Sequence, residues 1–415
     1  MSENPAPVSG PAEAGTRPGR PRFGRDFWLL WFGQGVSSVG SAASDLAYPL
    51  LVLHLGGTPF KAGLVGLVST GSRLLLRLVA GLVVDVCSRK RVLIWCDVGR
   101  AATAGGLAAA VVTGTAGYPL ILGAAFLEGA FSVFFFSAER AVLPYLVPRT
   151  RLSEAIAHNQ IYLQAATIAG APVGGFLFSL GAPVPFLVDT GSYLVSLAAV
   201  LGITTRLSGT EHKVPLATSE LFQGMRWVWH DRPGRASLVY LCGVNAIVAA
   251  MPLGVIVGLR TAGVAPAVIG ILLACGGIGG AAGALAVPQL RTKYRDGALL
   301  IALGWLWPPM LAVLAVSSAP WAVAIVIFLL ATTIAPTQSI IFGYQTAHAP
   351  DELQGRVHSA VNLLSNAVTP LAPAVVGALV SWGGFPATGA ALAVGALTMM
   401  ACATTSRSIR QFSNR

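Results

Sequence analysis

The sequence predicts an all-α membrane protein in which twelve transmembrane helices form two pseudo-symmetric six-helix bundles. Hydrophobic residues make up 54% of the 415 residues, charged residues make up only 10%, and the mean hydropathy is +0.71. The apolar residues also fall in long runs, and most basic residues lie between alternate runs. A soluble domain has about 25% charged residues, so lipid is the expected solvent for this chain.

The predicted helices follow from the lengths of these runs, because a bilayer core needs about 20 apolar residues per helix. The twelve spans are 27–53, 60–84, 91–113, 118–140, 157–180, 184–205, 236–258, 266–290, 298–317, 320–343, 357–381 and 385–404. Residues 1–25 are rich in Pro, Gly and Arg and contain no apolar run. We expect this segment to be a disordered tail, not a cleavable signal peptide.

The net charge of +11 reflects membrane topology. Most of the 27 Lys and Arg residues fall in the tails and in the loops after even-numbered spans, whereas the other set of loops holds only Lys61 and Arg260. This asymmetry follows the positive-inside rule and predicts that both termini are cytoplasmic. The basic residues are spread over many loops and form no single patch, so no nucleic-acid partner is expected.

The longest internal connection, residues 206–235, divides the chain into an N-terminal bundle (26–205) and a C-terminal bundle (236–404), followed by a cytoplasmic tail (405–415). Between Ser219 and Trp229 its apolar residues recur at helical spacing, which predicts an amphipathic helix at the inner interface.

The two halves are related by a constant offset of 202 residues. Six pairs at corresponding helix ends indicate a parallel duplication: Gly81 and Gly283, Arg89 and Arg291, Arg91 and Lys293, Pro148 and Pro350, Gly175 and Gly377, and Gly181 and Gly383. Two bundles related about the membrane normal, with a site between them, are typical of transporters.

The end of the second span carries a glycine, an acid and a basic cluster: Gly81, Asp85, Arg89, Lys90 and Arg91. A small residue there permits close helix approach, and the charges can pair or cap helix ends; an ordinary charged helix terminus is the alternative. The stretch resembles motif A of the major facilitator superfamily. Asp97 and Arg100 in the third span are expected to form an intrahelical or motif-linked structural pair.

The fifth span contains a glycine-rich turn with a proline: Gly170, Pro172, Gly174 and Gly175. In lipid, small residues permit close packing and a proline is tolerated, so a generic tight helix interface is one interpretation. The run is also similar to motif C of the same superfamily, with the proline one place late, and that resemblance implies antiport.

Four further segments narrow the resemblance: 25–31, 138–144, 189–193 and 350–357. In order and spacing they look like the branch that contains the enterobactin exporter and the macrolide-efflux proteins. The resemblance covers about residues 25–404. It implies the major facilitator fold and an alternating-access exporter driven by the proton gradient.

The Asp, Glu, Lys and Arg residues that lie inside the predicted spans, away from their ends, all fall in the N-terminal bundle. A charge at mid-bilayer costs about 2.5–3.5 kcal/mol, so such residues are usually paired or functional. Asp45 and Glu128 are the predicted proton-coupling residues, because the resemblance places their helices at the central cavity. Arg73 and Arg77 lie one turn apart and are the predicted partners of Asp45; a purely structural pair is the alternative.

Glu128 has no obvious partner nearby in the sequence, which suits a proton carrier. Asp189, near the outer end of a peripheral helix, is expected to be structural. The C-terminal bundle is expected to supply an uncharged wall of the substrate cavity, which suits hydrophobic or cationic amphiphiles. The candidate wall residues are Asn245, Thr332, Gln338, Asn362 and Asn366.

No P-loop, zinc-protease motif, serine-hydrolase motif or Cys/His cluster is present, so we expect no enzyme activity, cofactor or metal. The expected partners are the lipid bilayer, protons and a small-molecule substrate, for a monomer in the cell membrane. Three functions remain open. They are proton-coupled export of drug-like or natural-product molecules, export of one secreted metabolite such as a siderophore, and a polytopic membrane enzyme or receptor.

Overall fold

The computed structural model describes residues 23–205, 207 and 218–406. The predicted tails therefore lie largely outside the described residues, as does the first half of the predicted linker. All regular elements in the described part of the chain are helical.

The first half of the chain contains seven α-helices and one 3-10 turn. These are α1 (Arg25–His54), α2 (Pro59–Leu75), α3 (Arg77–Val86), α4 (Arg89–Val112), α5 (Tyr118–Leu146), η1 (Arg149–Arg151), α6 (Leu152–Leu180) and α7 (Val184–Leu201).

The second half contains eight α-helices and a corresponding 3-10 turn. These are α8 (Thr218–His230), α9 (Arg232–Thr261), α10 (Pro266–Lys293), α11 (Asp296–Trp305), α12 (Trp307–Val316), α13 (Pro320–His348), η2 (Asp351–Leu353), α14 (Gln354–Asn366) and α15 (Leu371–Thr405).

These helices make up twelve crossings. Nine described segments are long and apolar enough to span a membrane, and α2 with α3, bent by 45° at one break, makes a tenth. The eleventh is α4, whose first half carries the charged residues of the motif A region and the Asp97–Arg100 pair. The twelfth is the second part of α15, which bends at Gly384, where φ is +73° and favours glycine.

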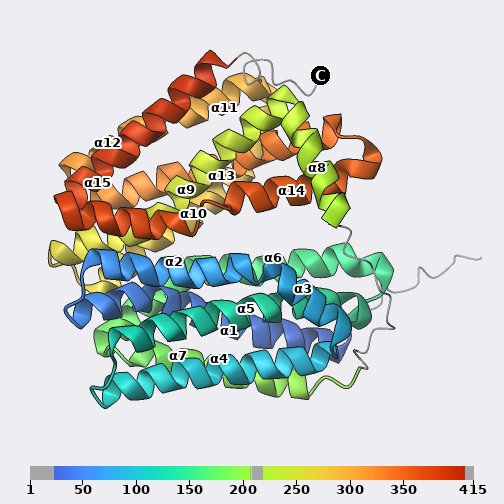
Figure 1. Cartoon of the computed structure of the whole chain (residues 1–415), viewed down its shortest axis with the longest axis vertical. Coiled ribbons are helices and arrows are strands. Elements are labelled where there is room, and N and C mark those ends of the chain that lie inside the picture. Colours follow the sequence, from blue (N-terminus) through green and yellow to red (C-terminus); the bar gives the residue numbers. More distant parts are fainter. Residues whose placement is uncertain (1–22, 206, 208–217, 407–415) are drawn as a thin grey trace, which may run out of the picture.

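The crossings form two lobes that lie side by side, with α1–α7 in one and α9–α15 in the other (Figure 1). Helix α8 stands at one end of the molecule and packs against α14, where Gly224 lies directly on the backbone of Arg356. We call this end the α8 end, and the end that carries the α1–α2 turn the opposite end. The described part of α8 lies within the segment predicted to hold an amphipathic helix.

The lobes meet along two seams, α6 against α10 and α2 against α15. Glycines permit both contacts near the opposite end: a Cβ on Gly175 would lie 3.0 Å from the carbonyl carbon of Pro266, and one on Gly377 would lie 3.1 Å from the Cα of Phe60. Gly175 and Gly377 are also a pair in the 202-residue repeat. The duplication therefore places equivalent glycines at equivalent seams.

Three crossings that were predicted to be continuous helices contain breaks. Pro308 and Pro309 follow the α11–α12 break, and Pro370 lies in the α14–α15 break, so at these sites the missing N–H groups explain the interruption. The α2–α3 break at Leu76 has no proline beside it, and the sequence gives no signal for it.

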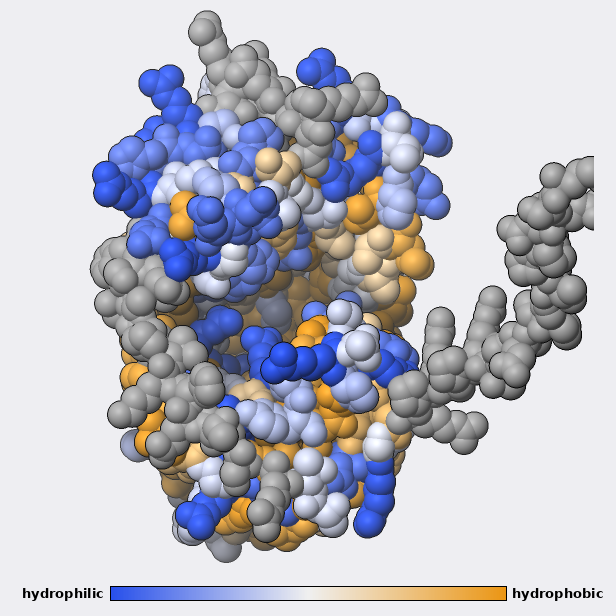
Figure 2. All heavy atoms as spheres, turned by 90° about the vertical axis from the view of Figure 1, so that its right-hand side faces the viewer, coloured by the Kyte–Doolittle hydropathy of each residue, from blue (hydrophilic) through white to orange (hydrophobic). Residues whose placement is uncertain are grey.

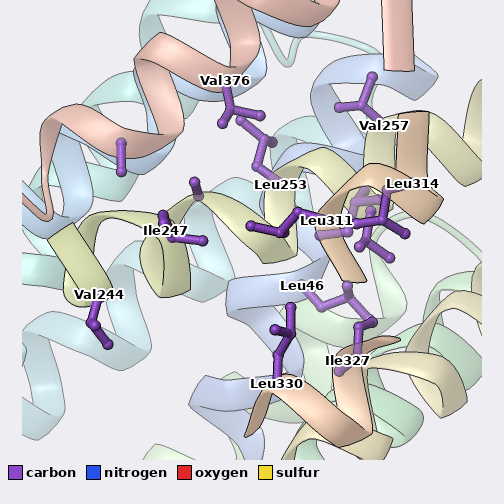
Figure 3. Close-up of a cluster of buried hydrophobic side chains, with 14 of the residues drawn as sticks. Leu46, Val244, Ile247, Leu253, Val257, Leu311, Leu314, Ile327, Leu330 and Val376 are labelled. Carbon is purple, nitrogen blue, oxygen red and sulfur yellow. The ribbon is translucent and has the colours of Figure 1, made fainter. Parts of the chain in front are cut away.

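The apolar core runs between the lobes as well as through them. Leu46 of α1 belongs to the same buried cluster as Ile327 and Leu330 of α13 and Leu311 of α12, and this cluster also contains Leu253 of α9 and Val376 of α15 (Figure 3). Lipid tails are as apolar as these side chains, so close packing holds the helices together more than transfer from water does.

Candidate functional site: a cleft between the lobes and a buried polar network

A cleft of about 420 Å³ lies between the lobes. It is lined by Thr70, Arg73, Leu74, Arg77, Val133, Phe136, Ser137, Arg140, Leu163, Asn366 and Thr369. The space-filling view of the α8 end shows a hollow between the two lobes, with hydrophilic residues at its rim (Figure 2). The cleft therefore opens at the α8 end, and the glycine contacts between the lobes close the opposite end.

Helical periodicity explains why α2 and α5 line the cleft together. Thr70, Arg73 and Arg77 follow one face of the α2–α3 crossing, and Val133, Phe136 and Arg140 follow one face of α5. The other wall is uncharged and comes from the α14–α15 break. There Asn366 donates to the carbonyl of Asn362 at 2.9 Å, and Thr369 donates to that of Asn366 at 2.7 Å. The Asn366 carbonyl also accepts the backbone N–H of Thr369 at 3.1 Å, so side-chain and backbone hydrogen bonds together order the chain at the break.

A second cavity of about 200 Å³ shares Thr70 and Arg73 with the cleft and is lined also by Asp45 and by residues of α9 and α15. Arg73 Nη2 lies 3.2 Å from Asp45 Oδ1, and the two side chains are 37% and 49% exposed. The structure thus joins Asp45 to Arg73, one of its two predicted partners. Because both groups reach the cavity, water screens the pair and it contributes little to stability.

Glu128 lies inside the N-terminal lobe and not in the cleft wall. Its side chain is 3% exposed, and Oε1 accepts hydrogen bonds from the Tyr193 hydroxyl of α7 and, at 3.4 Å, from Ser132. Its second oxygen has no hydrogen-bond partner among the described residues. Arg73 is close enough to interact with Glu128 electrostatically. Glu128 therefore lies behind Arg73, deeper in the lobe than the Asp45–Arg73 pair.

Asp97 and Arg100 form the predicted intrahelical pair. The Arg100 Nη2 to Asp97 Oδ1 distance is 2.5 Å, and both side chains are almost fully buried. Ser196 of α7 donates to the second carboxylate oxygen of Asp97 at 2.7 Å. The guanidinium of Arg100 lies over the Phe135 and Tyr193 rings, at 4.2 and 4.5 Å from their centroids.

Asp189 completes this network from the α7 side. It is 1% exposed and accepts a hydrogen bond from Ser192 at 3.1 Å. Gly40 of α1 makes room for it, because a Cβ there would lie 2.7 Å from its Oδ1. Tyr193 also contacts Ser41 of α1 at 2.9 Å. Side chains from α1, α4, α5 and α7 therefore share one buried polar network centred on Tyr193.

A further buried acid, Glu139, was not a site candidate in the sequence analysis. It is 3% exposed and accepts hydrogen bonds from Tyr162 at 2.6 Å and Asn159 at 3.2 Å. The sequence placed it near the end of a predicted span, beside Arg140. An acid at that depth, preceded by the apolar run 129–136, was the signal available for finding it.

The motif A residues lie around the α3–α4 turn at the α8 end. Lys90 donates to the carbonyls of Leu201 and Ile203, at 3.2 and 2.6 Å, and so ties α4 to the end of α7. Arg89 lies over the Tyr145 ring at 4.7 Å. Three residues have no close contact of this kind among the described residues: Gly81, Asp85 and Arg91.

The motif C-like glycines face two different helices. A Cβ on Gly170 or Gly174 would meet the backbone of α1, with the Gly174 position 2.8 Å from the Cα of Ala43, whereas Gly175 faces α10. Pro172 lies where Gly270 of α10 approaches α6. Helix α6 is thus held between its own lobe and the other one.

The predicted cavity residues of the C-terminal lobe are divided by the structure. Asn366 lines the cleft, Asn362 accepts its hydrogen bond one turn earlier, and Asn245 donates to the carbonyl of Ser365 at 3.1 Å. Thr332 instead packs on Gly283 between α10 and α13, and Gln338 is exposed elsewhere on α13. The predicted acids do not line the cleft itself: its lining contains three arginines and no acid, Asp45 lies in the adjoining cavity, and Glu128 is buried inside the lobe.

The comparisons with known proteins agree with this architecture. The family model described as Major Facilitator Superfamily matches residues 30–373, so the chain belongs to that superfamily of transporters. It is 26% identical over 383 residues to the multidrug efflux pump Tap of Mycobacterium tuberculosis, covering 88% of this chain and 90% of that one.

It is also 26% identical over 174 residues to the uncharacterized transporter YkuC of Bacillus subtilis, a match that spans 41% of this chain and only 40% of YkuC. Among solved structures, the nucleoside transporter NupG superposes with a TM-score of 0.73 at 11% identity, covering 92% of this chain and 99% of that one. At that identity, the likeness concerns the fold alone.

Proposed function

We propose that this chain is a secondary active exporter of small hydrophobic or amphipathic molecules, working by proton antiport with alternating access. The observation that carries the proposal is the cleft between two lobes, open on one side, with a carboxylate–guanidinium pair in its wall and a buried acid behind it. In this proposal the protein is a monomer that spans the cell membrane many times. Both termini and α8 face the cytoplasm, and the structure is then inward-facing.

The proposed movement is a rocking of the lobes about their seams. The glycine contacts of α6 with α10 and of α2 with α15 hold the opposite end closed. The α2–α3 and α14–α15 breaks lie beside each other, because Gly71 and Pro370 approach to 3.9 Å, measured from a Cβ built on Gly71. Bending at these breaks would close the α8 end while the glycine seams separate.

The proposed coupling runs through Asp45 and Glu128. A proton that reaches Asp45 through the cavity neutralises the carboxylate and removes its attraction for Arg73. Arg73 then interacts more strongly with Glu128, which lies in the next layer. The charge of the cleft wall therefore changes with each protonation, and this change would bias which end opens.

The proposed cargo is drug-like or a natural product. The cleft and the adjoining cavity, about 420 and 200 Å³, are in the range that binds molecules of drug size. A relative that matches most of this chain is described as a multidrug efflux pump, which supports efflux and a contribution to antibiotic resistance.

Transport in inverted membrane vesicles tests this function. We expect the wild-type chain to accumulate a fluorescent substrate when a proton gradient is imposed, and to stop when the gradient is collapsed. Asp45→Asn and Glu128→Gln should each lose gradient-driven accumulation while still permitting exchange of substrate down its own gradient. Unchanged proton-driven transport in both variants would remove these residues from the coupling.

A further inference from the structure

The cleft between the lobes is basic on one side and uncharged on the other. Its lining contains Arg73, Arg77 and Arg140 and no acid. Asp45 pairs with Arg73 from the adjoining cavity. Arg77 and Arg140 are exposed, and the described residues provide no ion-pair partner within 4.0 Å for either. Two guanidinium groups in the cleft are therefore available to a ligand.

The facing wall cannot neutralise them. Asn366 and Thr369, which line the cleft from the C-terminal lobe, are an amide and a hydroxyl. The acids Asp351 and Glu352 lie on the exposed turn η2, about four helical turns before Asn366. The neighbouring acid Glu139 interacts electrostatically with Arg140, but it is buried outside the cleft lining, where it accepts hydrogen bonds from Tyr162 and Asn159.

Closure of the cleft would then bury these arginines. A basic residue at a helix end that stays in water needs no partner, but a guanidinium withdrawn from water without a countercharge carries a large desolvation cost. In an alternating-access transporter the cleft must close around its cargo. A negative charge on the cargo would offset this cost, and a positive charge would increase it.

We propose that the transported molecule carries an anionic group, such as a carboxylate, phosphate or sulfonate, that docks on Arg77 and Arg140. Its apolar part would lie against Phe136 and Leu163, and Asn366 would donate or accept from the facing wall. This inference rests on the proposed export function and specifies its substrate class. Arginine suits such a role because its planar fork binds carboxylates and phosphates with two hydrogen bonds.

Two xanthene dyes of similar size but opposite charge provide the test: carboxyfluorescein, an anion, and rhodamine 123, a cation. The full chain is reconstituted in phosphatidylcholine vesicles, and uptake is measured under an imposed proton gradient. We expect uptake of the anion to exceed that of the cation. Arg77→Gln and Arg140→Gln should each reduce anion uptake about tenfold and leave cation uptake unreduced.

Two controls separate the ligand contact from folding. Arg149→Gln removes an exposed arginine of η1 outside the cleft and should leave uptake of both dyes unchanged. Arg77→Lys and Arg140→Lys keep the charge and should retain more anion uptake than the Gln variants. If the Gln variants do not fold, the preference of the wild-type chain and of the Lys variants for the anionic or the cationic dye still tests whether the substrate is anionic.

The outcomes distinguish the two proposals. Equal uptake of both dyes that is unaffected by the Gln substitutions would overturn the anionic substrate and leave proton-driven export standing. If neither dye were taken up under the gradient, the result would contradict polyspecific export itself. The proposal of an anionic substrate, which rests on export, would then be overturned as well.

A lipid headgroup offers the same chemistry as an anionic cargo. Uptake is therefore repeated with phosphatidylglycerol replacing part of the phosphatidylcholine. Anion uptake that is equal in both membranes would support a dissolved substrate. A wild-type loss of uptake with phosphatidylglycerol that disappears in the Gln variants would assign the arginines to lipid and overturn the proposal.

Discussion

At the scale of single residues, the charged groups of the N-terminal lobe fall into two sets. Asp45, Arg73, Arg77 and Arg140 meet water in the cleft and its side cavity. Asp97, Arg100, Glu128 and Asp189 are buried around Tyr193. In the first set, Asp45 can exchange a proton with water, and the arginines, which stay charged, can bind solutes directly. The second set is shielded from the cleft, so it can influence the cleft only through hydrogen bonds and through the electric field of its charges.

The Asp97–Arg100 pair is expected to behave as a structural unit. Asp97→Leu leaves the buried Arg100 charge without its carboxylate, which we expect to destabilise the fold by about 3–5 kcal/mol. The double variant Asp97→Leu/Arg100→Leu removes the uncompensated charge and should be less destabilised than the single variant. Thermal unfolding of the purified protein in detergent measures both. A double variant as unstable as the single one would contradict this account.

The sequence could predict only part of the residue-scale arrangement. The Asp45–Arg73 and Asp97–Arg100 pairs were predicted, because spacing along neighbouring helices or within one helix suggests them. The contact between Glu128 and Tyr193 joins positions 65 residues apart, on helices whose relative rotation the sequence does not encode in any local pattern. The arginine face of the cleft was predicted only in part: Arg73 and Arg77 were candidates as partners of Asp45, but Arg140, at the end of its predicted span, was not a site candidate.

At the scale of helices, glycines decide which faces come together. Gly174 and Gly175 are neighbours in the chain, yet the first faces α1 within the lobe and the second faces α10 of the other lobe. One helix turn therefore serves both the stability of the N-terminal lobe and the contact between the lobes.

Substitution of these two glycines should have different consequences. Gly174→Val forces a side chain against the backbone of α1 and should lower the unfolding temperature. Gly175→Val should spare the lobe but separate the seam with α10, so transport should fall more than stability. Gly191→Val is the matched control, because nothing lies within 4 Å of a Cβ there. Equal effects of the first two substitutions on both measurements would refute this division.

The positions of the helices could be predicted because apolar runs of bilayer length are rare outside membrane-spanning segments. The breaks could not be predicted equally well. Prolines accompany the α11–α12 and α14–α15 breaks and were available as signals, but a proline inside a membrane helix is often tolerated without a break. No proline lies beside Leu76 to explain the interruption there, and the packing of α2 on α15 and α5 is tertiary information that the local sequence does not contain.

At the scale of the whole molecule, the two lobes touch firmly at one end and diverge at the other. The contact between Gly71 and Pro370 lies beside the breaks of both crossings, at the boundary between the closed and the open part. A bond at this point would tie the two crossings together and prevent the lobes from separating here.

A disulfide between Gly71→Cys and Pro370→Cys should therefore stop transport reversibly. A Cβ on Gly71 lies 3.9 Å from that of Pro370, close to the usual Cβ separation in disulfides. The background must lack the five native cysteines (Cys87, Cys96, Cys242, Cys275 and Cys402). We expect dye uptake to fall on oxidation and to return with reductant, while each single-cysteine variant stays insensitive. Full uptake by the crosslinked protein would show that the lobes need not separate here.

The uneven distribution of charge between the lobes also affects how tightly export would be coupled to the proton gradient. An unloaded carrier that shut its α8 end would have to strip water from Arg77 and Arg140 against a partner wall of amides and hydroxyls. Under the proposed antiport, that barrier would keep the empty protein from turning outward, so protons would not enter without cargo leaving. Tight coupling would then arise from an absence of countercharge, with no dedicated latch required.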